Sequence, residues 1–357
     1  MLDETPGATT PHCRTSKKSS VTTFASKFGL ALGSILISLA VIELGLRVTG
    51  FEPRRPAVTA DFDAWAIPDA RMGWVNRAGT WKSAEPGNTP MTFEADGRRA
   101  DPAGHKPASL ARVLVVGCSF TQGYGVADDQ TFSHFVNKSL PSAELLNFGT
   151  GGYGSYQSRL RVSSYFNAPH SNTPLVIYGL FFSHHFRDLA PMQWIQSLTM
   201  QDGSYLVPPN VRVRSGQLVE SAGGPIGLWP LEDRSAAVTL AHLGVMVLTN
   251  RVTGKMGWPV FQHGILEMQK AVAANNAALL IIGLVPMPSE FREWLQAQRA
   301  NGIDFVACEH PDFGKDLALQ VGGVGHPSER LHRWWGDCVL KALAARGYLV
   351  NSNTLSQ

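Results

Sequence analysis

Four continuous apolar runs recur along the chain, and they constrain its fold more than any other feature. They lie at residues 112–117, 145–148, 175–180 and 279–285, and the stretches between them are long enough for crossover helices. A run rich in β-branched residues that ends in glycine, such as Arg-Val-Leu-Val-Val-Gly, is typical of a parallel strand buried on both faces. Strands that alternate with helices predict a doubly wound α/β sheet.

A second apolar segment, residues 28–48, has about the length that a helix needs to cross roughly 30 Å of hydrocarbon. Glu43 stands near one end, where a carboxylate reaches the headgroup region at lower cost than at the centre. Basic residues flank the segment on both sides, so the charge bias favours a cytoplasmic N-terminus only moderately. A cleaved signal peptide is the alternative, but the run is long for one and lacks a following Ala-x-Ala-like site. We predict an uncleaved signal anchor.

Composition indicates the domain boundaries in the rest of the chain. The N-terminus is rich in Thr, Ser and Pro, which predicts a disordered tail, and Pro and Gly punctuate the stretch that follows the anchor. Glycine-containing turns at 202–203 and 215–216 between β-branched runs predict an inserted β-ribbon at about 199–221. We expect a disordered cytoplasmic tail at 1–27, an anchor at 28–48 and a juxtamembrane extension at 49–108. The main domain is expected at 109–350, followed by a short tail at 351–357.

The overall composition argues against several classes of function. Hydrophobic residues at 44% and charged residues at 17% describe an ordinary globular protein, and a net charge of +3 is too small to favour nucleic acid. The four cysteines form no Cys-x-x-Cys pair, so neither a metal nor a cofactor is expected. Cys308 and Cys338 can pair if the domain is exported, or remain two buried thiols, and the sequence leaves both open.

Ser119 stands two residues beyond the apolar end of the first run. In an open α/β sheet, functional groups gather at the carboxyl ends of the strands, and backbone amides at the start of a following helix favour negative charge. A serine in this position is therefore a candidate nucleophile. The alternative is a residue that only caps the helix, and this segment does not decide between the two.

Three sequence blocks occur in the order typical of SGNH hydrolases, the GDSL-like lipases and esterases. They are GCSFTQGYGV at 117–126, NFGTGGYGSYQ at 147–157 and a His-Pro pair at 326–327. Together with the apolar segment, they make the chain resemble the membrane-anchored bacterial branch of this family. The resemblance implies a flavodoxin-like doubly wound parallel sheet, the SGNH hydrolase fold, which covers most of the chain.

The resemblance also assigns roles to residues. Ser119 would be the nucleophile and an oxyanion donor, Gly152 would donate its backbone N–H to the oxyanion, and His326 would be the general base. This set is chemically coherent, because a serine hydroxyl becomes nucleophilic when an imidazole accepts its proton and N–H donors stabilise the tetrahedral intermediate.

Three departures from the family pattern stand out. Cys118 replaces the usual aspartate before the serine, and we expect it to be buried and inert. His184 occupies the place of the usual asparagine, where an imidazole can donate a hydrogen bond to the oxyanion, or can merely pack or cap a helix. Residues 323 and 324 are Gly and Val, so the aspartate expected before His326 is missing.

The partner that orients His326 is therefore open. A backbone carbonyl or a carboxylate from elsewhere is expected to take this role, and the candidates are Asp304, Asp312 and Asp316. His332 matches a second family histidine, but packing is its expected role. Four tryptophans fit either an acyl or carbohydrate groove or the core, namely Trp194, Trp229, Trp334 and Trp335.

The function implied by the resemblance is acyl transfer to Ser119, followed by transfer to water or to a sugar hydroxyl. The expected substrate is an acyl ester, with an O-acylated surface glycan suggested by anchored relatives. The expected location is the cytoplasmic membrane, with the catalytic domain on the periplasmic or extracellular side. The main alternative is an inactive binding or assembly protein for a surface polysaccharide that kept the fold, and a soluble esterase is the third.

Overall fold

The computed structural model describes residues 19–53, 65–83, 88–170, 172–195, 197–198, 205–214, 217–226, 229–254, 256–322 and 325–348. The chain forms two compact units. The first holds Met1–Arg55 and Trp229–His242, and the second holds Pro56–Leu228 and Leu243–Gln357.

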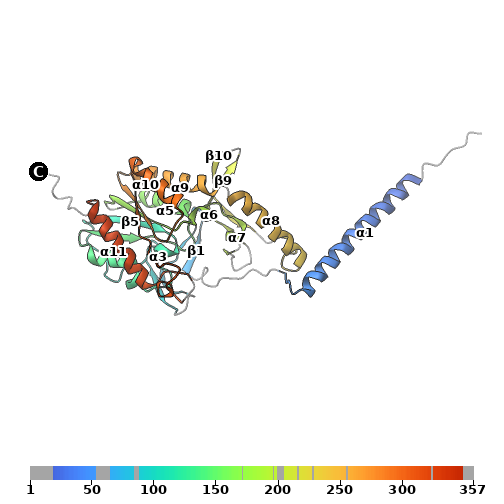
Figure 1. The fold of residues 1–357 in the computed structure, drawn as a ribbon, viewed down its shortest axis with the longest axis horizontal. Coiled ribbons are helices and arrows are strands. Elements are labelled where there is room, and N and C mark those ends of the chain that lie inside the picture. Colours follow the sequence, from blue (N-terminus) through green and yellow to red (C-terminus); the bar gives the residue numbers. More distant parts are fainter. Residues whose placement is uncertain are drawn as a thin grey trace, which may run out of the picture. The chain divides into compact units, whose positions relative to one another are not determined.

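The second unit is built on a parallel sheet of five strands (Figure 1). The strands are β5 (Ala111–Gly117), β6 (Ala143–Asn147), β7 (Leu175–Leu180), β12 (Ala278–Gly283) and β13 (Ile303–Ala307). Their order across the sheet is β13-β12-β7-β5-β6, which is the flavodoxin-like order 2-1-3-4-5 read from the other edge. The predicted fold class is confirmed, with one strand, β13, that was not expected from the apolar runs.

Helices cover both faces of this sheet. Val113 and Val115 of β5 face a core closed by α4 (Phe132–Ser139) and α11 (Glu329–Ala345). Leu114 and Val116 alternate to the other face. That face is covered by three helices, α5 (Ser155–Phe166), α9 (Gly257–Ala273) and α10 (Ser289–Ala297), as Figure 1 shows for α9 and α10 against α11. Burial on both faces explains why these strands are continuous apolar runs.

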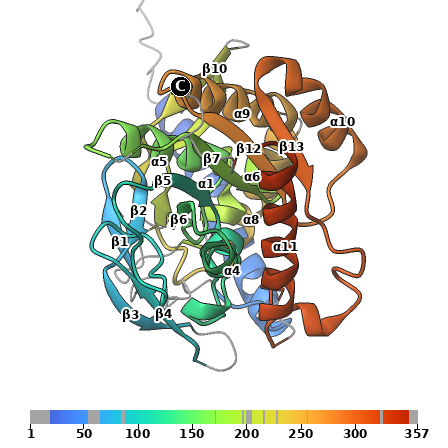
Figure 2. The same ribbon diagram turned by 90° about the vertical axis from the view of Figure 1, so that its left-hand side faces the viewer.

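Short elements join this framework. The helices are α3 (Ser119–Gln122), α6 (His184–Asp188), α7 (Met192–Ile195) and the 3₁₀ turns η1 (Asp128–Gln130), η2 (Gln298–Asn301) and η3 (Leu317–Leu319). Before the sheet, two antiparallel pairs form the extension (Figure 2): β1 (Ala66–Asp69) with β2 (Gly73–Asn76), and β3 (Gly79–Lys82) with β4 (Pro90–Phe93). Their aromatic side chains, Trp74 and Phe93 among them, pack in a small core with Tyr153.

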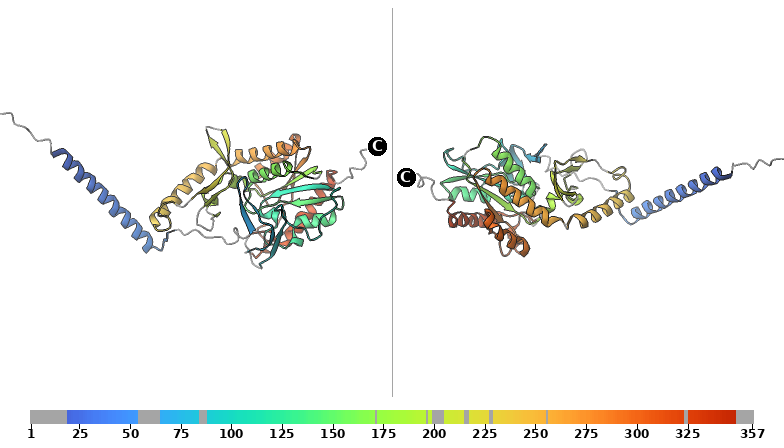
Figure 3. Two further views of the ribbon diagram at one scale, coloured as in Figure 1. Left: turned by 180° about the vertical axis from the view of Figure 1, so that it is seen from behind. Right: turned by 90° about the horizontal axis from the view of Figure 1, so that it is seen from above.

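The predicted β-ribbon is present as two antiparallel pairs (Figure 3). In one, β8 (Tyr205–Val207) pairs with β11 (Gly224–Ile226), and in the other β9 (Asn210–Arg214) pairs with β10 (Gln217–Ser221). The ribbon thus extends five residues beyond the predicted end at 221. The predicted turn residues at 202–203 and 215–216 lie outside the described residues.

The first unit contains α1 (Ser19–Val48) and the beginning of α8 (Ala236–Gly254). Helix α1 begins at Ser19, so residues 19–27, expected in the tail, are helical. Within the described residues, the stretch Ser26–Val48 is the single helix long and apolar enough to cross a membrane, as a membrane anchor or a signal sequence would be. Residues 1–18 and 351–357, both predicted tails, lie outside the described part of the chain.

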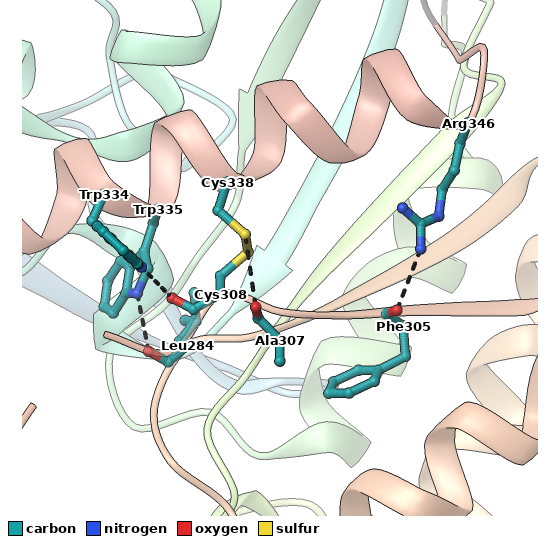
Figure 4. Close-up of a disulfide and its surroundings, with 8 residues drawn as sticks. All are labelled: Leu284, Phe305, Ala307, Cys308, Trp334, Trp335, Cys338 and Arg346. Carbon is teal, nitrogen blue, oxygen red and sulfur yellow. Dashed lines mark hydrogen bonds between the residues drawn. A yellow bond between two sulfur atoms is a disulfide. The ribbon is translucent and has the colours of Figure 1, made fainter. Parts of the chain in front are cut away.

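Cys308, just after β13, forms a disulfide with Cys338 of α11 (Figure 4). This resolves the pairing that the sequence left open. Two tryptophans beside the bridge fix the same helix to the sheet, because the ring N–H of Trp334 donates to the carbonyl of Cys308 at 3.0 Å and that of Trp335 donates to the carbonyl of Leu284 at 3.0 Å. The disulfide therefore ties the last helix to the edge strand of the sheet.

We predict that replacing both cysteines, in a Cys308→Ala/Cys338→Ala chain, lowers the free energy of unfolding by about 3–4 kcal/mol. The bridge spans 30 residues, and a cross-link of this size removes chain entropy from the unfolded state. Denaturation of the full chain in detergent checks this, with reduced wild-type protein as the control. An unchanged midpoint in both samples would contradict it.

Candidate active site

Ser119 begins helix α3 directly after the turn that ends β5. The turn is tight, since a side chain at Gly117 would place its Cβ 2.8 Å from the carbonyl oxygen of Gly179 on the neighbouring strand. Cys118 is fully buried in the core, as expected for an inert thiol. Ser119 is 7% exposed. Its own amide lies at the helix start, where backbone N–H groups have no intrahelical acceptor.

His326 lies beside Ser119 although 207 residues separate them in the chain. The distance from His326 Nε2 to Ser119 Oγ is 3.2 Å, which is hydrogen-bond range. Two rings flank the imidazole, with centroids 5.7 Å away for Phe120 and 4.8 Å away for Tyr124. The backbone is fixed as well, because the Val321 N–H donates to the His326 carbonyl at 2.8 Å. The structure brings the predicted nucleophile and base together.

Gly152 lies in the loop after β6 with φ +84°, a conformation that favours glycine. A Cβ at this position would lie 2.9 Å from Trp74 and 3.2 Å from Trp194. Trp74 also donates its ring N–H to the Gly151 carbonyl at 2.8 Å, and Arg187 donates to the Tyr153 carbonyl at 3.0 Å. The backbone of the predicted oxyanion loop is thus held from both sides by residues of the extension and of α6.

Two polar residues that the sequence analysis missed join this loop to the serine loop. The side-chain N–H of Asn147 donates to the Thr121 carbonyl at 2.8 Å, and its oxygen accepts from the Gly149 N–H at 2.9 Å. Buried Arg99 pairs with Asp128 at 2.7 Å and donates to three carbonyls at the end of α3 and just after it, those of Gln122, Gly123 and Val126. Asn147 is the first residue of the second sequence block, and this position could have indicated its role in the site.

His184 follows β7 at the same edge of the sheet, but its side chain is fully buried. Burial holds the pKa of this imidazole well below its usual range, so the ring is neutral. Its Nδ1 is hydrogen-bonded to the hydroxyl of Tyr178 on β7. Its Nε2 makes no hydrogen bond to any described residue. An imidazole with one unused ring nitrogen is therefore present near the predicted position of the asparagine.

Of the carboxylates considered for orienting His326, two have other partners. Asp304 accepts from the Tyr348 hydroxyl at 2.7 Å, and it lies on β13, three strands away from β5. Asp316 caps η3 through the Ala318 N–H at 2.9 Å and pairs with Arg330 at 3.0 Å. Asp312 and a backbone carbonyl stay candidates. Residues 323 and 324, where the family places its aspartate, lie outside the described residues.

Asp188 at the end of α6 is a buried carboxyl that sequence reasoning also missed. It accepts hydrogen bonds from the hydroxyl of Ser155 and, at 2.9 Å, from the N–H of Tyr156. These groups begin α5, so the carboxyl caps the helix that follows the Gly152 loop. Burial raises the pKa of Asp188 to about 7. The hydrogen bonds from Ser155 and Tyr156 lower this pKa, but by less than burial raises it.

Other predicted residues have structural places. His332 is buried against Phe132, whose N–H donates to His332 Nδ1 at 3.3 Å, and burial lowers the pKa of His332 to about 3. Packing was its expected role. Trp335 of α11 is buried in the core, whereas Trp194 is half-buried against Gly152. In the described part of the chain, no group of three or more His, Cys, Asp or Glu side chains could hold a metal ion.

Comparison with known proteins gives similar structures but no matching sequence family. No family model and no curated protein matches the chain. A member of the lipolytic protein G-D-S-L family from Veillonella parvula is 12% identical over 66% of this chain and 98% of its own, with a TM-score of 0.39. The psychrotrophic esterase EstA from Pseudoalteromonas sp. is 12% identical over 65% of this chain and 98% of its own, with a TM-score of 0.38.

A third similar structure is SsfX3, a salicylyl-acyltransferase from a tetracycline biosynthetic pathway. It is 13% identical over 73% of this chain and 61% of its own, with a TM-score of 0.39. The structures to which the chain is similar are therefore lipolytic proteins, esterases and an acyltransferase. Because these TM-scores lie below 0.5, we infer the activity from the geometry of the site alone.

We predict that Gly152→Ala destabilises the chain more than Gly104→Ala. Both glycines have positive φ, at +84° and +74°, so both substitutions carry the left-handed penalty of about 1–2 kcal/mol. Only at Gly152 does the new Cβ meet other atoms, which adds about 1–3 kcal/mol of overpacking. Thermal unfolding of the full chain in detergent compares the two. Equal losses would show that the contacts with Trp74 and Trp194 do not constrain the loop.

We predict that stability falls between about pH 4 and about pH 7 because of Asp188. Its pKa is about 7 in the fold against 3.8 as the ordinary value, so the folded chain binds more protons in this window. This stabilisation is complete below the ordinary pKa and is lost as pH rises through the folded pKa. Urea midpoints across this range check it. In Asp188→Asn this part of the pH dependence should vanish, and parallel curves for both proteins would contradict the assignment.

Proposed function

We propose that this chain is a membrane-tethered serine esterase or O-acyltransferase that works through an acyl intermediate on Ser119. The observation that carries the proposal is the 3.2 Å distance between His326 Nε2 and Ser119 Oγ. Nucleophile and base within hydrogen-bond reach are the signature of an activated serine. A protein that only kept the fold for binding would have no need to preserve this pairing.

In the first half-reaction, Ser119 Oγ attacks the acyl carbon of the ester while His326 Nε2 accepts its proton. The carbonyl oxygen becomes an oxyanion, which the backbone N–H groups of Ser119 and Gly152 stabilise. The tetrahedral intermediate then collapses, the imidazolium gives its proton to the departing alkoxide, and the acyl group stays on Ser119. Each N–H donor of this kind typically contributes about 3–4 kcal/mol to the transition state.

The protonation state of His184 would allow it to act as a third donor to the oxyanion. Burial raises the pKa of Tyr178 well above its usual range, so this phenol keeps its proton and can donate it to His184 Nδ1. The proton of the neutral imidazole is then on Nε2, which has no partner among the described residues. In this tautomer, His184 Nε2 is the donor in the place where the family uses an asparagine amide.

In the second half-reaction, His326 takes a proton from an acceptor hydroxyl, and the acceptor oxygen attacks the acyl carbon. Ser119 Oγ then leaves and takes the proton from His326. Water as the acceptor makes the protein an esterase, and a sugar hydroxyl makes it an acyltransferase. We propose an O-acylated surface glycan as the physiological acyl ester. Loops that exclude water from the acyl-serine would favour transfer over hydrolysis.

We further propose that α1 anchors the chain in the cytoplasmic membrane with the catalytic domain outside. The support is the length and apolar character of Ser26–Val48 together with the basic residues before it. The Cys308–Cys338 disulfide adds to this, because disulfides persist in oxidising compartments and are rare in the cytosol. The domain would then act in the periplasm or at the cell surface.

We predict that Ser119→Ala abolishes labelling by a fluorophosphonate probe and lowers hydrolysis of an acetyl ester by about 10³-fold or more. Cys118→Ala is the matched control, because this neighbour is fully buried and lies outside the proposed machinery. It should keep both labelling and turnover. If labelling is lost in Cys118→Ala instead, Cys118 is the nucleophile, and equal turnover by wild type and Ser119→Ala would rule out the acyl-Ser119 mechanism. A wild-type chain that the probe does not label and that hydrolyses no ester would be a binding protein.

A further inference from the structure

Glu43 lies inside the apolar stretch Ser26–Val48, and the first unit gives its carboxylate specific partners. One oxygen accepts from the Ala236 N–H at 3.0 Å. The other accepts from the Ala237 N–H at 2.9 Å and from the Ser235 hydroxyl at 2.8 Å. These are the first amides of α8, which have no acceptor within their own helix. Glu43 of α1 therefore caps a helix that begins almost two hundred residues later.

Arg47, one turn further along α1, completes the junction. Its Nε donates to Glu43 at 2.7 Å, so the carboxylate is also neutralised by a neighbouring cation. A second nitrogen of the same guanidinium donates to the Arg234 carbonyl at 2.6 Å, just before α8. Two residues one turn apart on α1, Glu43 and Arg47, thus hold the start of α8 by hydrogen bonds.

The position of Glu43 sets the depth of this junction. Five residues separate it from the end of α1 at Val48, which corresponds to about 7–8 Å along the helix. If α1 spans a bilayer, Glu43 lies near the boundary between hydrocarbon and headgroups, where a paired carboxylate is tolerated. The N-terminus of α8 then lies at the same depth, because it is bonded to Glu43.

The segment Trp229–His242 carries side chains that suit the boundary between hydrocarbon and headgroups. Leu231 and Leu240 are 60% and 45% exposed, and Trp229 is an aromatic residue of the kind enriched at membrane interfaces. A hollow of about 600 Å³ with mostly apolar lining opens between α1 and this segment. Its apolar lining includes Leu39, Ala40, Leu231, Val238 and Ala241, and its polar lining is Glu43, Arg47, Arg234 and Ser235. The hollow continues the exposed apolar surface of α1.

One ionisable pair of this segment is buried and paired internally, which suits a low-dielectric environment. Glu232 and His242 are both buried, and the His242 Nδ1 lies 2.7 Å from a Glu232 carboxylate oxygen. The other carboxylate oxygen accepts from the Trp229 N–H at 3.1 Å. The Trp229 ring stacks on the His242 ring with centroids 4.4 Å apart. Asp233 and Arg234 of the same segment are exposed, so the segment presents both apolar and charged groups, as suits the boundary between hydrocarbon and headgroups.

We infer that Trp229–His242 is a second membrane contact that lies in the outer interface of the bilayer beside α1, with lipid acyl chains in the hollow. The occupant is lipid because the hollow continues the surface of the helix that spans the membrane. The inference rests on the proposed function only in its premise that α1 is the anchor. It adds that the anchor carries a docked segment and that Glu43 holds it there.

The test places an environment-sensitive nitrobenzoxadiazole label at Leu240→Cys in the full chain. Cys13→Ser removes the cysteine of the N-terminal tail, and the remaining cysteines are buried or paired. The protein is reconstituted in phosphatidylethanolamine and phosphatidylglycerol vesicles that contain doxyl-labelled lipid. We expect quenching several-fold stronger than at Leu317→Cys, a leucine of the second unit that is 69% exposed. Equal quenching at the two positions would overturn the inference.

The role of Glu43 is tested in the same labelled chain. Glu43→Leu makes α1 more apolar, so the protein should stay in the membrane after carbonate extraction, but quenching at position 240 should fall toward the Leu317 level. Ser38→Leu is the matched control, because the Ser38 hydroxyl bonds within α1 to the Ser34 carbonyl, and it should change nothing. Quenching unaffected by Glu43→Leu would overturn the capping role.

Two further outcomes identify which premise fails. Cross-linking between Leu240→Cys residues of two copies, without quenching by lipid, would replace the lipid by a second copy and overturn the inference. Release of the wild-type chain by carbonate would remove the anchor itself, and the inference with it. Neither readout depends on Ser119, so a failure of the proposed chemistry would be seen separately, in the fluorophosphonate experiment.

Discussion

The hydrogen bonds of Asn147 are the constraint on which the rest of the site depends. Parallel pairing of β5 with β6 brings the ends of these strands to one edge of the sheet, but it does not fix the loops beyond them. Asn147 does this, since it donates to the Thr121 carbonyl behind the serine and accepts from Gly149 in the glycine loop. Both proposed backbone donors, those of Ser119 and Gly152, are thereby set relative to one another. Because such donors act through their preorganisation, rigidity of this pair matters more than any single contact with substrate.

The sheet and the two strongest site residues were readable from sequence because their signals are local. Strands buried on both faces give continuous apolar runs, and the serine and histidine sit in short blocks of defined order. Strand β13 escaped because it lies at the edge, half-buried, with Asp304 and exposed Ala307 interrupting the apolar pattern. Asp188 and Arg99 escaped for another reason. A buried charge is recognised only by its partners, and those of Arg99 are backbone carbonyls whose position the sequence does not show.

Packing and a backbone hydrogen bond position the ring of His326. Two aromatic rings, those of Phe120 and Tyr124, flank the imidazole, and its loop is tied back through Val321. Packing can fix the direction of a ring, but it supplies no charge to stabilise the imidazolium. In the family pattern one aspartate combines orientation with charge stabilisation, whereas the contacts described around His326 account for its orientation.

The chain uses carboxyl groups at helix starts in two places, and their environments give them opposite properties. Asp188 caps α5 inside the second unit, where full burial raises its pKa to about 7 although the nearby Arg187 lowers it. Glu43 caps α8 in the first unit, where Arg47 stands beside it as a counter-charge. The carboxyl of Asp188 can therefore be protonated or ionised near neutral pH, and both forms cap α5. The carboxylate of Glu43 also accepts from the first amides of α8, so a cation and a helix start both face it.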